Sequence, residues 1–424
     1  MSRLAICFVA SLAFATAALA QQPVEPVLSL VKKERQPFLD TLKELVSIET
    51  GTRDLEGLEK AAYLIEGRLQ ALGGKVELVD PPADAYYRMA DTPAKVGKIV
   101  RATFEGKGKK RILLLAHMDT VYLHGMLARQ PFRVERDRAW GLGIVDDKQG
   151  IALVLHALAV LKQMDFRDYG LVTVLINADE EMSSPGSRKL ITREGERHDI
   201  VFSCESTRVD SDKLALATSG IASVVLKVKG RASHAGSAPE MGRNALYELA
   251  HQIMQMRDLS DPSTGLKMNW TLAQAGTNRN VIPAEATATA DVRVLRVADY
   301  DRIEREVRER IRNKLIPDTQ VEMTFERRRP PLEANAAARA LGAHAQKVYA
   351  EIGRKLTVDP VAEGGGTDAA FAALESHAAT LERFGLQGAG AHSNDAEYIV
   401  LDSIEPRLYL LARMIMDVSQ GKDR

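Results

Sequence analysis

A short apolar run that ends in a histidine and an aspartate constrains this fold more than any other stretch of the chain. Residues 112–115 are Ile-Leu-Leu-Leu, and Ala116-His117-Met118-Asp119 comes next, which predicts a buried strand with polar groups at its carboxyl end. Because strand side chains alternate between two faces, His117 and Asp119 are expected to point the same way. A neutral imidazole is a good zinc ligand, and a neighbouring carboxylate can take its second N–H. Taken alone, the pair favours an ordinary structural histidine, so its meaning depends on the rest of the chain.

Two further predicted strands also end in acidic residues. They cover residues 171–178 and 199–204, and the acids directly after them are Asp179, Glu180, Glu181 and Glu205. Asp146 and Asp147 lie at the start of a predicted helix, where carboxylates can also be simple caps. Ligands of an open α/β sheet bind outside the carboxyl ends of its strands. The sequence therefore predicts that the histidine and these acids meet at one edge of a sheet.

The remaining pattern of the chain predicts an α/β domain interrupted by an α+β insert. Helices are expected at 36–48, 55–72, 151–164, 336–349 and 404–418, with a strand at 75–79 and neighbouring strands at 99–104 and 112–115. Between them, strands at 222–229, 266–275, 286–294 and 320–327 and helices at 244–259 and 299–315 have the order β-α-β-β-α-β. That order is ferredoxin-like and forms a self-sufficient unit. We therefore divide the chain into 21–218 and 330–424, the two segments of the α/β domain, and 219–329, the inserted α+β domain.

Length and composition agree with a two-domain globular protein. The chain has 424 residues, of which 45% are hydrophobic and 27% charged. Its formal net charge is zero, which argues against broad electrostatic binding to nucleic acid or to an anionic membrane. A small molecule or a short peptide is the expected partner.

The first residues predict export. Arg3 is followed by an apolar run from Leu4 to Ala17 and then by Ala18-Leu19-Ala20, which is typical of a secretory signal cut after Ala20. A membrane anchor is the alternative, but the run is short for a span. Residues 1–20 are thus expected to be removed, leaving a periplasmic or secreted protein whose one cysteine, Cys204, can form no internal disulfide.

Two imidazoles and three carboxylates from these motifs suit a pair of zinc ions with one bridging carboxylate. The candidate ligands are His117, Asp146, Glu181, Glu205 and His392. Two such ions can polarise a carbonyl and share a hydroxide nucleophile. A further glutamate that binds no metal would carry the proton from water to the leaving nitrogen.

The order of these motifs resembles that of the M20 metallopeptidases. The matching stretches are His117-Met118-Asp119, Gly143-Ile144-Val145-Asp146-Asp147-Lys148, Asp179-Glu180-Glu181, Glu205, Ala232-Ser233-His234-Ala235-Gly236, Asn278-Arg279-Asn280, Asp291-Val292-Arg293, Gly364-Gly365-Gly366-Thr367-Asp368 and Ala391-His392-Ser393. The resemblance covers essentially the whole mature chain. It implies a zinc-exopeptidase-type α/β catalytic domain with a ferredoxin-like lid that also serves in dimerisation.

The resemblance implies a role for each matching position. Asp146 would bridge two Zn²⁺, with Co²⁺ or Mn²⁺ as possible substitutes, and the Asp146–Asp147 peptide would be cis. His117 and Glu205 would complete one metal, and Glu181 and His392 the other. Glu180 would be the general base, and Asp119 the partner of His117.

In the lid, the resemblance implies residues that hold the substrate. Arg293 and Asn280 would clamp its terminal carboxylate, since the guanidinium fork suits a carboxylate. His234 would donate to the tetrahedral oxyanion, often from the partner subunit of a homodimer. Gly365 is a further substrate-binding candidate.

The expected activity is hydrolysis of the amide bond to a C-terminal amino acid, with glutamate favoured by the resemblance. A second carboxylate on the product needs a second cation, for which Lys213 and Arg329 near the lid boundaries are candidates. The alternatives are an N-acyl-amino-acid deacylase, a dipeptidase, or a binding protein that has lost catalysis. The last would be expected to lack the base or a ligand, and this chain has both.

Overall fold

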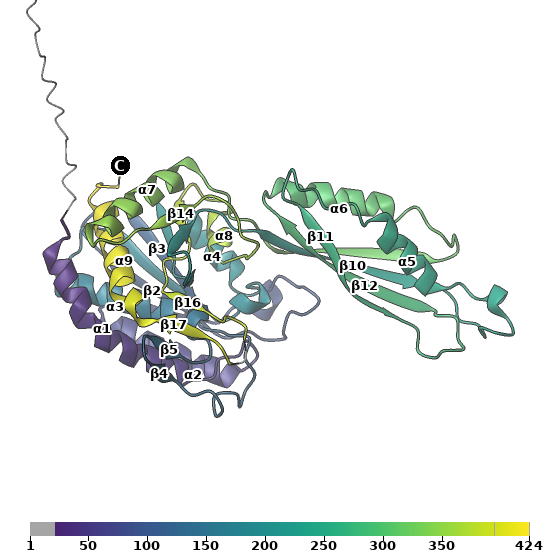
Figure 1. Ribbon diagram of the computed structural model, residues 1–424, viewed down its shortest axis with the longest axis horizontal. Coiled ribbons are helices and arrows are strands. Elements are labelled where there is room, and N and C mark those ends of the chain that lie inside the picture. The colour runs from purple at the N-terminus through teal and green to yellow at the C-terminus, as the bar shows by residue number, and fades with distance from the viewer. Residues whose placement is uncertain (1–21, 394, 424) are drawn as a thin grey trace, which may run out of the picture.

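The computed structural model describes residues 22–393 and 395–423, which form a larger and a smaller body joined by a narrow connection (Figure 1). The helices are α1 (Glu25–Val46), α2 (Leu55–Ala71), α3 (Gln149–Gln163), α4 (Arg188–Glu196), α5 (Ala245–Gln255), α6 (Ala298–Arg310), α7 (Ala336–Glu351), α8 (Ala369–Ala373) and α9 (Ile404–Ser419). The predicted signal segment, residues 1–20, lies outside the described residues. Among the residues described, no helix combines the length and apolar character that crossing a bilayer requires.

The strands of the larger body lie on both sides of the insert in the sequence. They are β1 (Lys75–Val79), β2 (Ile99–Glu105), β3 (Arg111–His117), β4 (Arg133–Glu135), β5 (Arg138–Trp140), β6 (Leu171–Asn177), β7 (Ile200–Ser203), β8 (Thr207–Arg208), β9 (Lys213–Ala215), β14 (Thr357–Asp359), β15 (Ala379–Leu381), β16 (Gln387–Ala389) and β17 (Tyr398–Val400). A six-stranded sheet with the order β1-β2-β6-β3-β7-β15 forms the centre of this body. Its strands β6, β3, β7 and β15 run parallel, so their carboxyl ends meet at one edge.

Strand β3 shows why the apolar run is buried on both faces. Ile112 and Leu114 belong to the large core cluster that includes α1, α2, α3 and α9, whereas Leu113 and Leu115 belong to a separate cluster with α4 and α8. Helices cover both faces of a parallel sheet, which is why its strands are continuously apolar. The predicted strand is therefore central, and it delivers His117 at its end.

The prediction that residues 99–104 and 112–115 form neighbouring strands is wrong. Strand β6 lies between β2 and β3, antiparallel to the first and parallel to the second. The connection between β2 and β3 crosses the start of β6, where the N–H of Gly108 donates to the carbonyl of Tyr169 at 2.9 Å. Because β6 is buried from Val172 to Asn177, it requires a neighbour on each side. Proximity in sequence did not reveal this insertion.

The smaller body contains β10 (Gly220–Lys229), β11 (Lys267–Ala275), β12 (Glu285–Val294) and β13 (Gln320–Arg329), together with α5 and α6. These elements have the predicted order β-α-β-β-α-β. The sheet is antiparallel with the order β11-β12-β10-β13. Its own core cluster includes Val224, Leu249 and Ile303. Figure 1 shows this body extending away from the larger one, with the chain entering and leaving at a single end.

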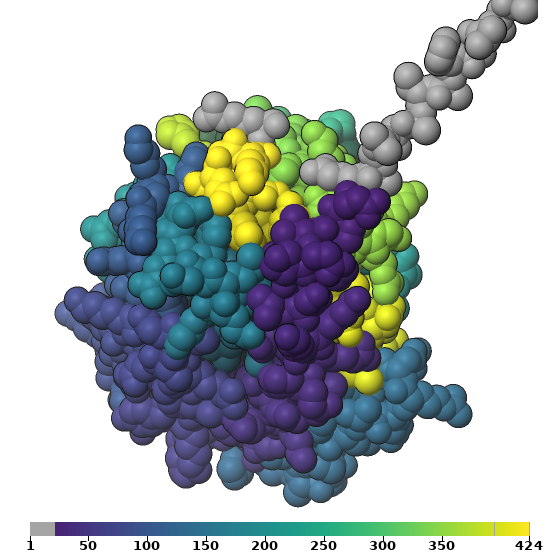
Figure 2. All heavy atoms as spheres, turned by 90° about the vertical axis from the view of Figure 1, so that its left-hand side faces the viewer, coloured from purple at the N-terminus to yellow at the C-terminus, as the bar shows by residue number. Residues whose placement is uncertain are grey.

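The two ends of the chain close the larger body together. Figure 2 views it from the end opposite the smaller body, and purple N-terminal residues lie beside yellow C-terminal ones. Helix α1 begins eleven residues before the predicted start at residue 36, because the buried Val27 and Val31 extend its apolar stripe. Arg35 of α1 pairs with Glu405 of α9 at 3.1 Å.

Candidate metal and catalytic centre

The histidine at the end of β3 lies among three acidic side chains. Its Nε2 is 2.9 Å from Oδ1 of Asp146 and 3.4 Å from Oε1 of Glu205. Its Nδ1 is 3.1 Å from the backbone oxygen of Asp119 and 3.4 Å from Oδ1 of that residue. The imidazole thus presents Nε2 to the carboxylates of Asp146 and Glu205, while Asp119 contacts Nδ1 on the other side of the ring.

Asp146 lies between two histidines, each of which is also close to a glutamate. While its Oδ1 faces His117, its Oδ2 is 3.2 Å from Nε2 of His392, which is also 3.2 Å from Oε2 of Glu181. The donor atoms of Asp146, Glu181 and His392 all lie within 4.8 Å of one another. All five predicted ligands are therefore brought together, with one carboxylate between the two histidines.

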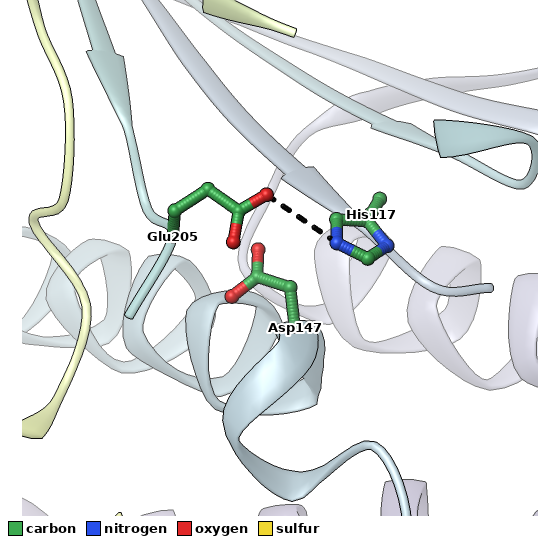
Figure 3. Close-up of side chains that lie close together, drawn as sticks. All are labelled: His117, Asp147 and Glu205. Atoms are coloured by element: carbon green, nitrogen blue, oxygen red, sulfur yellow. Dashed lines mark ion pairs between the residues drawn. The ribbon is translucent and has the colours of Figure 1, made fainter. Parts of the chain in front are cut away.

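Asp147 is a candidate metal ligand, a role that the sequence did not predict for it. With His117 and Glu205 it forms a second group whose donor atoms lie within 4.8 Å of one another, and Figure 3 shows the three side chains converging. The peptide between Asp146 and Asp147 is cis, as expected. Oδ1 of Asp147 accepts a hydrogen bond of 2.6 Å from Gln149. The adjacent pair of acids was the available signal, but a cap was the simpler interpretation.

Two buried oxygens suggest that these groups fit cations. Within the described part of the chain, Oδ2 of Asp147 and Oε1 of Glu181 are buried and accept no hydrogen bond. Leaving a buried acceptor unsatisfied is costly, so such atoms call for an explanation. Imidazole and carboxylate together are a suitable donor set for zinc.

The pKa shifts of the side chains in the centre also favour bound cations. Burial would lower the pKa of His117, but the charge of Glu205 and the other carboxylates outweighs it and raises that pKa well above its ordinary value. Hydrogen bonds to Asp146 and Glu181 raise the pKa of His392 to about 11. Burial raises the pKa of Glu181 to about 7, although His392 opposes this. Crowded carboxylates thus hold protons on both imidazoles, and a metal cation would take the place of those protons.

Asp119 organises the loop that carries two of the glutamates. Its Oδ1 accepts from the backbone N–H of Glu180 at 3.0 Å, and its Oδ2 accepts from that of Glu181 at 3.1 Å. The hydroxyl of Thr52 also donates to Oδ2 at 2.8 Å. Asp119 therefore links the end of β3 to the loop after β6, besides lying next to His117.

The carboxylate of Glu180 pairs with a buried arginine. Nη2 of Arg329 is 2.9 Å from Oε1 of Glu180 and donates to its carbonyl at 2.8 Å, while Nη1 donates to Oδ1 of Asp368 at 2.6 Å. Burial raises the pKa of Glu180 well above its ordinary value, and Arg329 opposes that shift. Sequence analysis connected Arg329 with substrate and did not foresee this contact.

Other substrate-binding candidates gather where the smaller body joins the larger. Arg293 donates to the carbonyl of Gly364 at 2.9 Å and pairs with Asp291 through two hydrogen bonds of 2.9 and 3.0 Å. The carbonyl of Gly365 accepts from Ser219 at 2.9 Å. Lys213 is buried and pairs with Asp359 and Glu363.

His234 and Asn280 lie together at the opposite end of the smaller body. Both are exposed, and a bridge joins His234 to Val281. Nδ1 of His234 accepts from the N–H groups of Gly236 and Ser237 at 3.1 Å each. Strand β10 leaves the junction at Gly220 and covers ten residues, so its far end lies about 30 Å away. Within one chain, these two residues are thus remote from the junction.

Comparison with known proteins establishes the family. The model of the family described as Peptidase family M20/M25/M40 matches residues 113–417. The chain is also 44% identical over 421 residues to carboxypeptidase G2 of Pseudomonas sp. (strain RS-16), an alignment that covers 99% of each protein. The protein belongs to the M20 family of metallopeptidases. It is similar along its full length to that carboxypeptidase.

Solved structures share the fold. Aminopeptidase PepT from Bacillus cereus ATCC 10987 superposes with a TM-score of 0.72 at 20% identity, covering 91% of this chain and 98% of that one. An M20 family metallo-carboxypeptidase from Sulfolobus solfataricus gives 0.69 at 17% identity, covering 89% and 98%. At these identities the likeness shows the M20 peptidase fold alone.

Proposed function

We propose that this protein is a dizinc metallo-exopeptidase that releases a C-terminal amino acid, preferably glutamate, from N-acyl or peptide donors. The observation that carries the proposal is the position of Asp146 between His117 and His392, with Glu205 on one side and Glu181 on the other. That arrangement suits two cations sharing one carboxylate. The near full-length similarity to carboxypeptidase G2 supports the activity.

The bound metals would supply Lewis-acid polarisation of the scissile carbonyl and a lowered pKa for water. Glu180 would accept the proton of the attacking water and pass it to the leaving nitrogen. Asp119 would hold both His117 and the backbone of Glu180 through its hydrogen bonds to each. Arg329 keeps the Glu180 carboxylate in a fixed place, where a base must be in order to act.

The leaving amino acid would lie toward the junction of the two bodies. Arg293 would bind its α-carboxylate after exchanging its pairing with Asp291. Asn280, remote from the junction within one chain, would serve as the second clamp only when supplied by a partner subunit or after closure of the two bodies. Lys213 and Arg329 are the candidate cations for a glutamate side chain, which would have to share them with their present acidic partners, and Gly365 lies in the adjoining loop. The acyl part would occupy a cavity of about 580 Å³ that is lined by Glu181, Thr120 and Leu123 on the other side of the centre.

We also propose that the protein acts as a homodimer joined through the smaller body. Leu249 of α5 is buried, but Leu246, Tyr247 and Met254 are 44%, 62% and 55% exposed. Strand β11 is an edge of its sheet, and no strand among the described residues pairs with its outer side. A partner covering these features would bring a second His234 near the centre, where it could donate to the oxyanion. Sedimentation at micromolar concentration should give a dimer, and a fully active monomer would contradict this.

Export is proposed on the N-terminal pattern, with cleavage after Ala20. The exported protein should begin at Gln21 by N-terminal sequencing. A full-length chain retained in the cytoplasm would contradict it.

The activity is tested by glutamate release. Metal-free protein, prepared with a chelator, should be inactive on N-benzoyl-glutamate and should regain activity with added Zn²⁺. N-acetyl amino acids and free dipeptides are the competing substrates, because they would favour a deacylase or a dipeptidase. A higher kcat/KM for either of these than for N-benzoyl-glutamate would replace the proposal with that alternative.

A further inference from the structure

Glu397 is a buried carboxylate that is not one of the proposed metal ligands. It accepts hydrogen bonds from a loop that carries one of those ligands. Glu397 is 3% exposed. Its Oε1 accepts from the backbone N–H groups of Val145 and Asp146 at 2.8 and 3.1 Å, and its Oε2 accepts from that of Gly143 at 2.8 Å. The hydroxyl of Tyr122 also donates to Oε2. Four donors thus surround one carboxylate.

The donors come from segments that are separate in the sequence. Gly143, Val145 and Asp146 belong to the turn that precedes α3, where Gly143 has a φ of 69°. Tyr122 comes after β3, the strand that ends at His117. Its hydroxyl oxygen also lies 2.8 Å from the carbonyl oxygen of Ser393, the residue after His392. Glu397 therefore touches the backbone of the central carboxylate and, through one phenol, the neighbourhood of both histidines.

This arrangement explains how a turn with an irregular backbone holds a fixed shape. The backbone angles of Asp146 are φ −133° and ψ 90°, which are not helical although α3 begins only three residues later. Its N–H and those of Gly143 and Val145 cannot all find partners within a regular helix start. A carboxylate can accept all three at once, whereas an amide of the same shape presents one acceptor and one donor.

We propose that Glu397 is a positioning residue that presets Asp146 and His392 for metal binding. This rests on the proposed function, because it assumes that Asp146 and His392 are ligands. Loops that are already held in place can bind a cation without first becoming ordered. Removing the hydrogen bonds that hold them should therefore lower the affinity for metal. Glu397 itself touches neither substrate nor metal.

The test is the affinity of the metal-free protein for Zn²⁺, measured by competition with a chromophoric chelator. Glu397→Gln places an N–H₂ group against backbone donors and should weaken Zn²⁺ binding by roughly 10–100-fold. Tyr122→Phe keeps the three backbone hydrogen bonds of Glu397 and removes the phenol that contacts both Glu397 and Ser393. It should weaken the site of His392 and Glu181 by a smaller factor and leave the other site unchanged.

Glu34→Gln is the matched control. Glu34 is also a buried carboxylate, but its partners are His156 and Gln163. It should lower the melting temperature of the metal-free protein without changing Zn²⁺ affinity. Equal loss of affinity in Glu34→Gln and Glu397→Gln would overturn the proposal, as would unchanged affinity in Glu397→Gln. If Glu397→Gln does not fold, Tyr122→Phe gives the answer. If the wild-type protein bound no Zn²⁺, the proposed function itself would fail.

Discussion

The larger and smaller bodies hold their candidate residues in opposite ways. In the larger body, His117, Asp119 and Glu180 are buried, and each contacts at least one partner from another segment. At the far end of the smaller body, His234 and Asn280 are exposed, and the contacts of His234 are with its own loop and with Val281.

The difference teaches which parts of the reaction one chain can perform alone. The larger body contains a complete candidate ligand set and base, so metal binding should require nothing else. The junction adds Arg293, which is within reach of the Gly364 loop. The remote residues can contribute only after a large closure or from a second copy of the chain. Metal binding, clamping and oxyanion donation should therefore be separable by mutation.

The largest expected effect is loss of the centre itself. Asp146→Ala should abolish both metal binding and turnover, because this carboxylate faces both histidines. Metal content by atomic emission, together with glutamate release, measures both. Asp210→Ala is the matched control, since that exposed carboxylate pairs with Arg208 outside the centre. Retention of two ions per chain in Asp146→Ala would rule out its bridging role.

Loss of the carboxylate clamp should be smaller and general. A hydrogen bond to a charged group contributes roughly 1.5–3 kcal/mol, so Arg293→Ala should lower kcat/KM about ten- to a hundredfold for every substrate. Lys213→Ala should lower it for N-acyl-Glu but not for N-acyl-Leu. Arg329→Ala should lower both, because it also holds Glu180.

Arg312→Ala, which removes an exposed partner of Glu309, is the control for these arginine variants. An unchanged Glu-to-Leu ratio in Lys213→Ala would remove that residue from specificity.

The remote histidine should complement between subunits. His234→Ala and Glu180→Gln homodimers should each be nearly inactive. A randomly mixed population of the two should regain about a quarter of wild-type activity, since half the dimers are mixed and each has one intact site. Refolding the two variants together and assaying the mixture tests this. No recovery from two inactive variants would mean that His234 acts within its own chain, and a fully active His234→Ala homodimer would mean that it does not act at all.

The smallest effect concerns stability and pH. Burial raises the pKa of Glu382 in the larger body to about 8, and the charge of Glu205 adds to this. The folded state then binds more protons than the unfolded state between about pH 4.5 and 8, so this group makes stability fall as pH rises through that window. Glu382→Gln should flatten the fall, measured by urea unfolding of metal-free protein at pH 5 and 8.5.

Glu34 should change the pH dependence of stability in the opposite direction. The hydrogen bond from His156 lowers its pKa, so its contribution is present above the unfolded value and is lost as pH falls. Glu34→Gln should therefore lower stability at neutral pH. For Glu382→Gln, a steeper fall of stability with rising pH would contradict the raised pKa that is assigned to Glu382.

Much of the fold could be predicted from the sequence, because hydrophobic periodicity and the residues at strand ends carry strong signals. The apolar run before His117 and the order of elements from 220 to 329 were predicted correctly. The order of strands in the large sheet was not, because pairing between β2 and β6 depends on contacts remote in sequence.

Contacts made by side chains were the harder part of the centre to foresee. The contact between Arg329 and Glu180 joins residues 149 positions apart, and no local pattern indicates it. Glu397 resembles any glutamate before a short strand, and its role emerges only when four donors surround it. Asp147 looked like a cap because acids at helix starts usually are.

The most direct test of the centre is Glu180→Gln, with metal content and turnover measured on the same sample. The variant should keep two metal ions per chain and lose about 10²–10⁴-fold in kcat, because the amide cannot accept the proton of water. Loss of a metal ion together with activity would show that Glu180 is a ligand, and the assignments of Glu180 and Glu181 would then have to be exchanged.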